Sequence, residues 1–466
     1  MKSLFKIDDI GKLFISFFTV CFIFLWDIKY NFFNARYLFL ILLFPIVSNI
    51  YLEIRNGEFK FIIHFFYISI FLFFHLFINL FLDDKSIEFN YLGGIIFFLL
   101  IFVIVYYYNE KILNNLDLII LIFLLIFSSS LIYSLYNFER STPFFCGGMA
   151  VPDFLIKYIN QGYDYFFSTS GSNVHSTYKI NTTGNNSYLN LRVTFKELIF
   201  KENSHLGMIA PSVIIYLIYK LQNKKLSIFY NCLFLLFLIT CFIKSSTTFL
   251  AGTTASLFVI SIFNFKKIPI RILITYILLF TICITIISTN KECRKRLSIK
   301  VNKGENFILN LEEKKKKYKR SIFDLPFLKK SHHSISSEVY FRSLLVAKYS
   351  IFKKPLGWGF NRYVDAFNAY NESYPPKRDL LNYLNNKDGS NIFVKLIVEF
   401  GIFSMFLFIF TLNYLASNNI KLEEKLFLMP IIITQMIRGA GYFNGGFLLI
   451  VLLIVFSYIR NRKKLQ

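Results

Sequence analysis

The chain has 466 residues, of which 55% are hydrophobic and 17% are charged, and its mean hydropathy is +0.50. These values exclude an ordinary water-soluble domain, in which about 25% of residues are charged. Lipid is therefore expected to be the main solvent of the chain. The formal net charge of +24 predicts that part of its surface attracts anionic groups.

Apolar stretches long enough to cross a bilayer recur along the whole chain. About 20 mostly apolar residues span the hydrocarbon core, and such a stretch forms a helix because lipid offers the backbone no hydrogen-bond partners. The sequence therefore predicts an all-α polytopic membrane protein, with residues 1–466 forming a single integral membrane domain. Its transmembrane helices, about twelve by this length rule, are expected near residues 12–28, 36–52, 59–82, 89–108, 116–136, 205–222, 226–243, 247–263, 268–288, 391–415, 426–438 and 446–460.

Two long hydrophilic loops, residues 137–204 and 289–390, interrupt these spans. Lys and Arg residues in the termini and in alternate short connections number 18 on one side of the predicted topology and five on the other. Cytoplasmic loops carry the excess of Lys and Arg. Both termini are therefore expected in the cytoplasm, and both long loops on the opposite, outward side of the membrane. The second loop holds 22 Lys and Arg against 10 Asp and Glu, but long loops translocate largely regardless of charge.

Each long loop carries an arginine that is followed 15 residues later by a glycine. These are Arg192 before Gly207 and Arg342 before Gly357. A guanidinium is always charged and binds phosphate oxygens through two parallel hydrogen bonds, so two arginines converging from separate loops would suit a pyrophosphate. The alternative is that they contact lipid headgroups or local carboxylates.

A group of polar residues stands where a predicted span begins, after the first long loop. Glu202 and His205 are candidates for a base and its orienting partner toward a sugar hydroxyl. A helix start capped by Asn203 or Ser204 is the alternative. Asn391, at the start of another span, is likewise either a cap or a sugar-binding amide. The candidate substrate-binding residues are Asn203, Asn391, Gly357 and Arg438.

Motifs of nucleotide, redox and metal sites do not occur. The sequence contains no Walker loop, GxGxxG, CxxC or HExxH, so no cofactor, no metal site and no nucleic-acid partner is expected. Cys146 and Cys293 both lie in the long loops, and their spacing does not decide whether they pair. Glu399, inside a predicted span, is costly in lipid unless it faces a polar cavity or a partner.

Residues 355–361 (PLGWGFN) and 396–403 (LIVEFGIF) are the most specific segments of the chain. Together with the span pattern and both outward loops, they resemble the O-antigen polymerase and ligase superfamily. The resemblance implies a GT-C-like, metal-independent glycosyltransferase of the bacterial inner membrane that uses an undecaprenyl-diphosphate-linked glycan. Arg192 and Arg342 would hold the lipid diphosphate, and Glu202 or His205 would act as base. Membrane lipid and a chain-length regulator are the implied partners.

One departure from the superfamily bears on the reaction. Ligases usually have a histidine before the asparagine at the start of the closing span, whereas this chain has Ser390 before Asn391. The difference favours a polymerase that joins repeat units into O-antigen or capsular polysaccharide. The alternatives are a ligase that transfers glycan to lipid A core and a polysaccharide flippase. A flippase would be expected to carry charges along its spans, which are nearly uncharged here.

Overall fold

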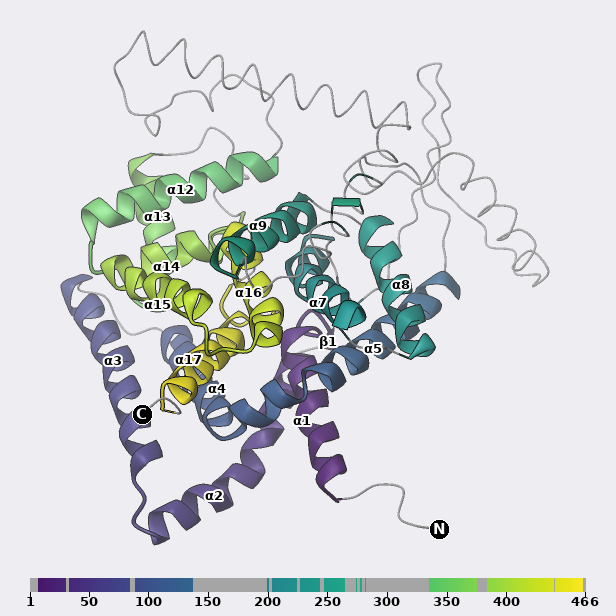
Figure 1. The fold of residues 1–466 in the computed structure, drawn as a ribbon. Coiled ribbons are helices and arrows are strands. Elements are labelled where there is room, and N and C mark those ends of the chain that lie inside the picture. The colour runs from purple at the N-terminus through teal and green to yellow at the C-terminus, as the bar shows by residue number, and fades with distance from the viewer. Residues whose placement is uncertain are drawn as a thin grey trace, which may run out of the picture.

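Helices make up nearly all of the described structure (Figure 1). The computed structural model describes residues 7–30, 33–83, 89–136, 199–200, 203–223, 227–243, 247–264, 335–374, 384–439 and 441–463, with the single positions 274, 277, 278 and 281. The first half contains α1 (Ile7–Ile23), β1 (Lys29–Tyr30), β2 (Phe33–Asn34), η1 (Ala35–Leu42), α2 (Leu43–Arg55), α3 (Lys60–Asp83), α4 (Phe89–Asn114) and α5 (Leu116–Tyr136). The second half contains α7 (Asn203–Asn223), α8 (Ile228–Ile243), α9 (Thr247–Asn264), α12 (Ile335–Lys353), α13 (Tyr363–Ser373), α14 (Ile392–Phe400), η5 (Gly401–Phe403), α15 (Ser404–Ala416), α16 (Leu422–Ile437) and α17 (Phe447–Lys463).

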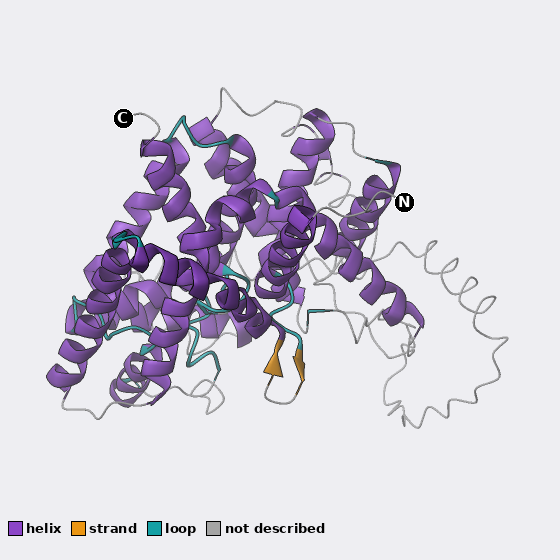
Figure 2. Cartoon of the chain, turned by 90° about the horizontal axis from the view of Figure 1, so that it is seen from below, coloured by secondary structure: helices purple, strands orange, loops and turns teal. Residues whose placement is uncertain are grey.

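The expected all-α class is confirmed. Helices occupy every predicted span except residues 268–288, most of which lie outside the described residues. The strands β1 and β2 form a small antiparallel hairpin between α1 and η1, in which Lys29 pairs with Asn34 (Figure 2). The first long loop, 137–204, and the first part of the second, 289–334, fall almost wholly outside the described residues, and so do Cys146 and Cys293.

Several helices are long and apolar enough to cross a membrane, which indicates a membrane protein. Among the described residues there are five of this kind: Ala35–Arg55, Lys60–Phe77, Tyr91–Asn114, Ser204–Asn223 and Ile392–Ala416. The share of buried residues is 78% in the stretch of α7 and 17% in that of η1 and α2. Helix α7 therefore lies at the centre of the bundle, and η1 with α2 forms its periphery.

Two spans are not regular α-helices, and each has a local cause. Residues 35–42 form a 3-10 helix that ends three residues before Pro45. Pro45, in the first turn of α2, has no N–H for the Ile41 carbonyl, which accepts the Leu43 N–H instead. The span predicted at 391–415 is divided into α14 and α15 by η5, which begins at Gly401.

Helices α7, α9 and α16 pack together at the centre of the bundle. A Cβ atom on Gly252 of α9 would lie 2.5 Å from the Thr434 side chain of α16, so the glycine lets these backbones approach closely. Ser212 of α7 donates its hydroxyl to the Phe427 carbonyl of α16 at 2.5 Å. Small side chains thus allow the central contacts, as in other membrane bundles.

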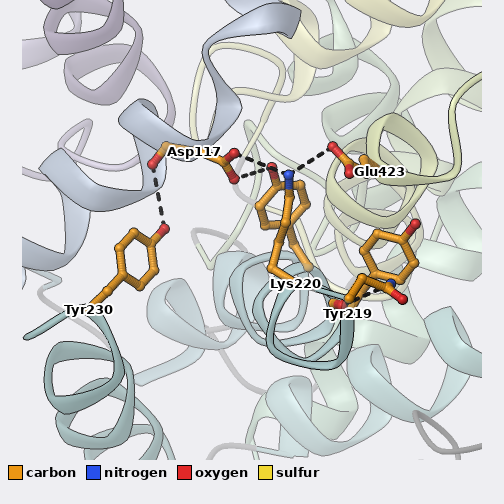
Figure 3. A network of polar contacts seen from close by, with 7 residues as sticks. Asp117, Tyr219, Lys220, Tyr230 and Glu423 are labelled. Carbon is orange, nitrogen blue, oxygen red and sulfur yellow. Dashed lines mark hydrogen bonds and ion pairs between the residues drawn. The ribbon is translucent and has the colours of Figure 1, made fainter. Parts of the chain in front are cut away.

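Helix α7 defines two polar ends of the bundle, here named the His205 end and the Lys220 end. These residues are 15 positions apart on one helix, which corresponds to about 22 Å. At the Lys220 end, the ammonium of Lys220 is 2% exposed and donates to Asp117 of α5 at 3.1 Å and Glu423 of α16 at 2.9 Å (Figure 3). Tyr216 donates to the same Asp117 carboxylate at 2.6 Å. Lys220 therefore joins α5, α7 and α16.

Two charged residues in the first turn of α16 make further polar contacts at the Lys220 end. Lys425 is 1% exposed and donates to Asn264 Oδ1 at 2.8 Å and to the Leu415 carbonyl at 2.6 Å. Glu424 accepts a hydrogen bond from Ser457 of α17 at 2.6 Å. Charged groups buried here are thus paired, which removes most of the cost of their desolvation.

Replacing Lys220 with methionine is expected to destabilise the bundle without unfolding it. The variant loses two charge-assisted hydrogen bonds, but the remaining carboxylates of Asp117 and Glu423 are 56% and 35% exposed and stay hydrated. We expect the free energy of unfolding to fall by about 1–3 kcal/mol, measured by thermal unfolding of the purified protein in detergent. The control is Lys12→Met, whose partner Asp9 is exposed. Equal melting temperatures for Lys220→Met and the native chain would contradict this assignment.

Candidate active site at the His205 end

Several of the predicted site residues lie toward the His205 end of the bundle, each with its own set of contacts. Of the predicted site residues, Arg192 and Glu202 lie outside the described residues. Helix α7 begins at Asn203, so a helix does start here, and the capping part of that alternative stays a prediction. His205, Asn391, Arg438 and Arg342 are described, and each has a defined environment. Their predicted functional roles stay predictions.

His205 is oriented by a carboxylate from the other side of the sequence. Its Nδ1 donates to Asp27 Oδ2 at 2.5 Å, and the two side chains are 16% and 5% exposed. The Trp26 ring lies 4.6 Å from the imidazole, centroid to centroid. Because a carboxylate only accepts, Nδ1 is assigned the proton in this pair, and a neutral ring in this tautomer has its acceptor at Nε2. The pair therefore has the geometry of an oriented general base.

Trp26 connects His205 to the far end of α16. Gly445 has a φ of +59°, and a Cβ there would lie 2.8 Å from Gln435 Nε2 and 3.6 Å from Trp26 Nε1. Gln435 also donates to the Gly445 carbonyl at 2.7 Å. The end of α1, the start of α7 and the end of α16 are thus in contact.

Asn391 is the N-cap of α14, as one of its two predicted roles requires. Its Oδ1 accepts the Val394 backbone N–H at 2.7 Å, which satisfies one of the free donors of the first turn. The side chain is buried, and within the described part of the chain its Nδ2 has no hydrogen-bond partner. Ser390 has a φ of +63° and accepts from Asn385 Nδ2 at 3.1 Å. The capping role is confirmed, and the sugar-binding role stays a prediction.

Arg438 directly follows α16 and lies between α14 and α12. The neighbouring Gly439 donates its N–H to the Ser390 carbonyl at 3.2 Å, which fixes this backbone beside the start of α14. Burial raises the pKa of Tyr340 on α12, and the nearby charge of Arg438 offsets part of that increase. The half-buried side chain of Arg438 is therefore near enough to α12 for its charge to act on Tyr340.

Arg342 is held on α12 by α13. Its Nε donates to Asn371 Oδ1 at 3.0 Å, its Nη2 donates to the same atom, and Nη2 also donates to the Tyr374 carbonyl at 3.1 Å. The guanidinium lies 5.2 Å from the Tyr370 ring centroid and 5.9 Å from that of Phe367. Burial lowers the pKa of Arg342, although a guanidinium stays charged. No carboxylate ion pair of Arg342 is found within the described ranges, so its charge is balanced there by neutral acceptors and rings.

The segments 355–361 and 396–403, on which the family resemblance depends, pack directly on each other. Trp358 N–H donates to the Val398 carbonyl and Gly359 N–H to the Glu399 carbonyl, each at 2.9 Å. A Cβ on Gly357 would lie 2.3 Å from the Glu399 carbonyl oxygen, and one on Gly401 would lie 2.0 Å from that of Pro355. Gly357, predicted to bind substrate, thus has a packing role, and its contact with substrate stays a prediction.

Glu399 has partners, as an acid inside a span requires. Its side chain is fully buried, its Oε2 accepts the Asn361 N–H at 2.8 Å, and its Oε1 accepts the Tyr363 N–H at 3.1 Å. Lys395, one turn earlier, lies 3.8 Å from Oε1. A further ion pair joins Arg362 to Asp365 at 2.7 Å. These contacts fix the segment that leads into α13, which lies with α12 and α14 at the upper left of Figure 1.

Lys354 adds a titratable cation beside this loop. Its ammonium lies 4.3 Å from the Trp358 ring centroid. Burial, together with the nearby charge of Arg362, lowers the pKa of Lys354 from 10.5 to about 8. Among the described residues no group of three His, Cys, Asp or Glu side chains gathers in a way that could hold a metal ion.

Several residues of this end were not predicted from the sequence. The sequence places Asp27 and Trp26 beside the end of the first apolar run, but it gives no sign that they reach His205. The sequence did contain a signal that Lys395 is a partner of Glu399, because a lysine and a glutamate four residues apart lie on one helix face. Asn371 and Tyr363 carry no distinguishing pattern.

Comparisons of the chain with protein-family models, with curated proteins and with solved structures found no match.

Substituting Gly401 with alanine is expected to break the contact between the two segments. The added methyl would lie 2.0 Å from the Pro355 carbonyl, and Gly401 has a φ of +52°. We expect the free energy of unfolding to fall by about 2 kcal/mol or more, read as a lower melting temperature in detergent. Gly93→Ala is the matched control, because nothing lies within 4 Å of that Cβ. An unchanged melting temperature for Gly401→Ala would show that the contact is not made.

Proposed function

We propose that this chain polymerises undecaprenyl-diphosphate-linked oligosaccharide repeat units into O-antigen or capsular polysaccharide. It would be a metal-independent glycosyltransferase of about twelve spans with a GT-C-like fold, acting at the periplasmic face of the bacterial inner membrane. The proposed topology has cytoplasmic termini, so the Lys220 end faces the cytoplasm and the His205 end the periplasm. Membrane lipid and a chain-length regulator are the proposed partners.

The observation that supports the proposal is that a base and two guanidinium groups lie toward the same end of the bundle, on α7, on α12 and directly after α16. The base is His205 with Asp27 at 2.5 Å. The cations are Arg342, held by Asn371, and Arg438, whose charge acts on Tyr340 of the same helix as Arg342. Glycosyl transfer from a lipid diphosphate needs these two kinds of group, a base for the acceptor hydroxyl and positive charge for the leaving group.

The proposed reaction assigns each group a step. His205 Nε2 accepts the proton of an acceptor hydroxyl while the hydroxyl oxygen forms a bond to the donor anomeric carbon. The bond from that carbon to the diphosphate oxygen breaks, and its electron pair leaves with undecaprenyl diphosphate. Arg342 and Arg438, with Arg192 from the first loop, stabilise the negative charge on the leaving group. Asp27 stabilises the imidazolium, which then returns its proton to solvent.

Ser390 supports a polymerase more than a ligase. It occupies the position where ligases of the resembling superfamily usually have histidine. Here it is buried and its hydroxyl accepts from Asn385, so this position offers no second base. His205 remains the candidate base from the described residues.

Binding of undecaprenyl diphosphate by the purified chain in detergent tests the proposal. We expect saturable binding that Arg342→Ala and Arg438→Ala each weaken by at least about tenfold, because each removes charge-assisted hydrogen bonds. His205→Ala should keep the affinity and lose formation of polymer from a lipid-linked repeat unit. The matched control is Arg462→Ala, an arginine that stacks on Tyr458 at the Lys220 end.

Two results would refute the proposed function. One is that undecaprenyl diphosphate binds no more tightly than phosphatidylglycerol, which would mean that the arginines attract any anionic lipid. The other is that Arg342→Ala or Arg192→Ala still produces long chains in a polymerase-deficient host.

The topology is tested separately with alkaline phosphatase fusions, since the enzyme is active only after export. Fusions after residues 160 and 330 are expected to be active because both lie in the proposed periplasmic loops. A fusion after residue 225, in the connection between α7 and α8, is expected to be inactive. The reverse pattern would place the His205 end in the cytoplasm.

A further inference from the structure

Both oxygens of the buried Glu399 carboxylate accept hydrogen bonds from the chain's own backbone. Each oxygen accepts a backbone N–H, from Asn361 at 2.8 Å and from Tyr363 at 3.1 Å. The side chain is fully buried, and that of its neighbour Lys395 is 3% exposed. Neither group can touch a substrate that approaches from the end of the bundle. The pair therefore acts indirectly, through the two segments that it contacts.

On one side, Glu399 holds the start of α13. Tyr363 is the first residue of that helix, and Asn371 lies near its other end. Asn371 Oδ1 accepts two N–H groups of Arg342, and the Tyr370 ring supports the same guanidinium at 5.2 Å. A helix of 11 residues is rigid, so the anchor at Tyr363 determines where Asn371 places Arg342.

On the other side, Lys395 holds the segment that precedes α14. Its ammonium donates to the Lys387 carbonyl at 2.8 Å and lies 3.6 Å from Asp388 Oδ1. The same segment ends at Asn391, and a Cβ on its Gly389 would lie 2.9 Å from the Tyr363 ring. Lys395 and Glu399 are one turn apart on α14, so one short helix fixes both neighbours.

We infer that Glu399 and Lys395 are positioning residues that set Arg342 and Asn391 relative to each other through α13 and the 384–391 segment. The inference rests on the proposed role of Arg342 in binding a lipid diphosphate. It assigns a task to the charged pair that packing alone does not require, because apolar residues of similar volume pack a bundle equally well.

The test combines Glu399→Gln with Asn371→Ala, using undecaprenyl diphosphate as the probe. A glutamine at 399 offers one oxygen and one NH₂ group, and the NH₂ would face a backbone N–H. We expect each single variant to weaken binding by at least about tenfold. Both substitutions act on Arg342 through α13. The affinity of the double variant should therefore be no lower than that of the single variant with the lower affinity. Multiplied effects in the double variant would overturn the inference.

Hydrogen exchange of α13 gives a readout that needs no ligand. Glu399→Gln is expected to speed exchange of its backbone amides, whereas Lys220→Met, which breaks a buried pair at the opposite end, should leave them unchanged. Unchanged exchange in Glu399→Gln would overturn the inference whatever the binding result. The native chain could bind no undecaprenyl diphosphate while exchange in α13 is still faster in Glu399→Gln. That result would refute the proposed function but still support the anchoring of α13 by Glu399.

Two further variants separate positioning from simple loss of a charge. Lys395→Met combined with Glu399→Gln removes both charges. If Glu399→Gln weakened binding only because the charge of Lys395 was no longer balanced by Glu399, this double variant would recover the affinity. That recovery would overturn the inference. Glu399→Asp keeps the charge on a shorter side chain and replaces Glu399→Gln where the latter does not fold. It is expected to bind more weakly than the native chain by at least about tenfold, and native affinity in this variant would also overturn the inference.

Discussion

The described structure depends on one constraint, that a charge inside an apolar bundle must be matched by partners from the same chain. A carboxylate at the centre of a membrane helix costs about 2.5–3.5 kcal/mol on insertion scales. Glu399 meets this requirement with Lys395 and two backbone N–H groups. Those contacts bring the 355–361 segment against α14, and the close approach requires glycine at 357 and 401. The break between α14 and α15 follows from that approach.

The same constraint explains why polar side chains gather at two ends. At the Lys220 end, the ammonium groups of Lys220 and Lys425 pair with acceptors from neighbouring helices. They join helices that are far apart in the sequence, so each pair closes a large loop of chain. At the His205 end, the pairs leave polar atoms such as Asn391 Nδ2 without partners in the described part of the chain. The contacts of Lys220 and Lys425 thus join helices of the bundle, whereas Asn391 Nδ2 keeps a buried donor at the other end.

Local features of the sequence predicted much of this fold. Hydropathy located the helices of the bundle, because that signal arises within one element. Asn391 before an apolar run correctly indicated a cap. The partner of His205 could not be predicted, since Asp27 is 178 residues away and only the packing of α1 against the rest brings it near. Hydropathy likewise showed that Glu399 needs a partner, but not that this partner is the loop after Pro355.

The proposed chemistry places its two kinds of group on different elements. His205 lies in the first turn of α7 and Asp27 follows the end of α1, and both helices are packed into the bundle core. Arg342 belongs to α12, which contacts that core through α14 and its neighbours. Transfer requires the base and the anion site to keep a fixed separation, because small displacements reduce the rate strongly. Helix α14 contacts the elements near both groups. Its first residues contact the end of α16 beside Gln435, and its last turn carries Glu399. Under the proposed function, a rigid α14 would therefore let a base in the bundle and a cation on an outer helix act on one substrate.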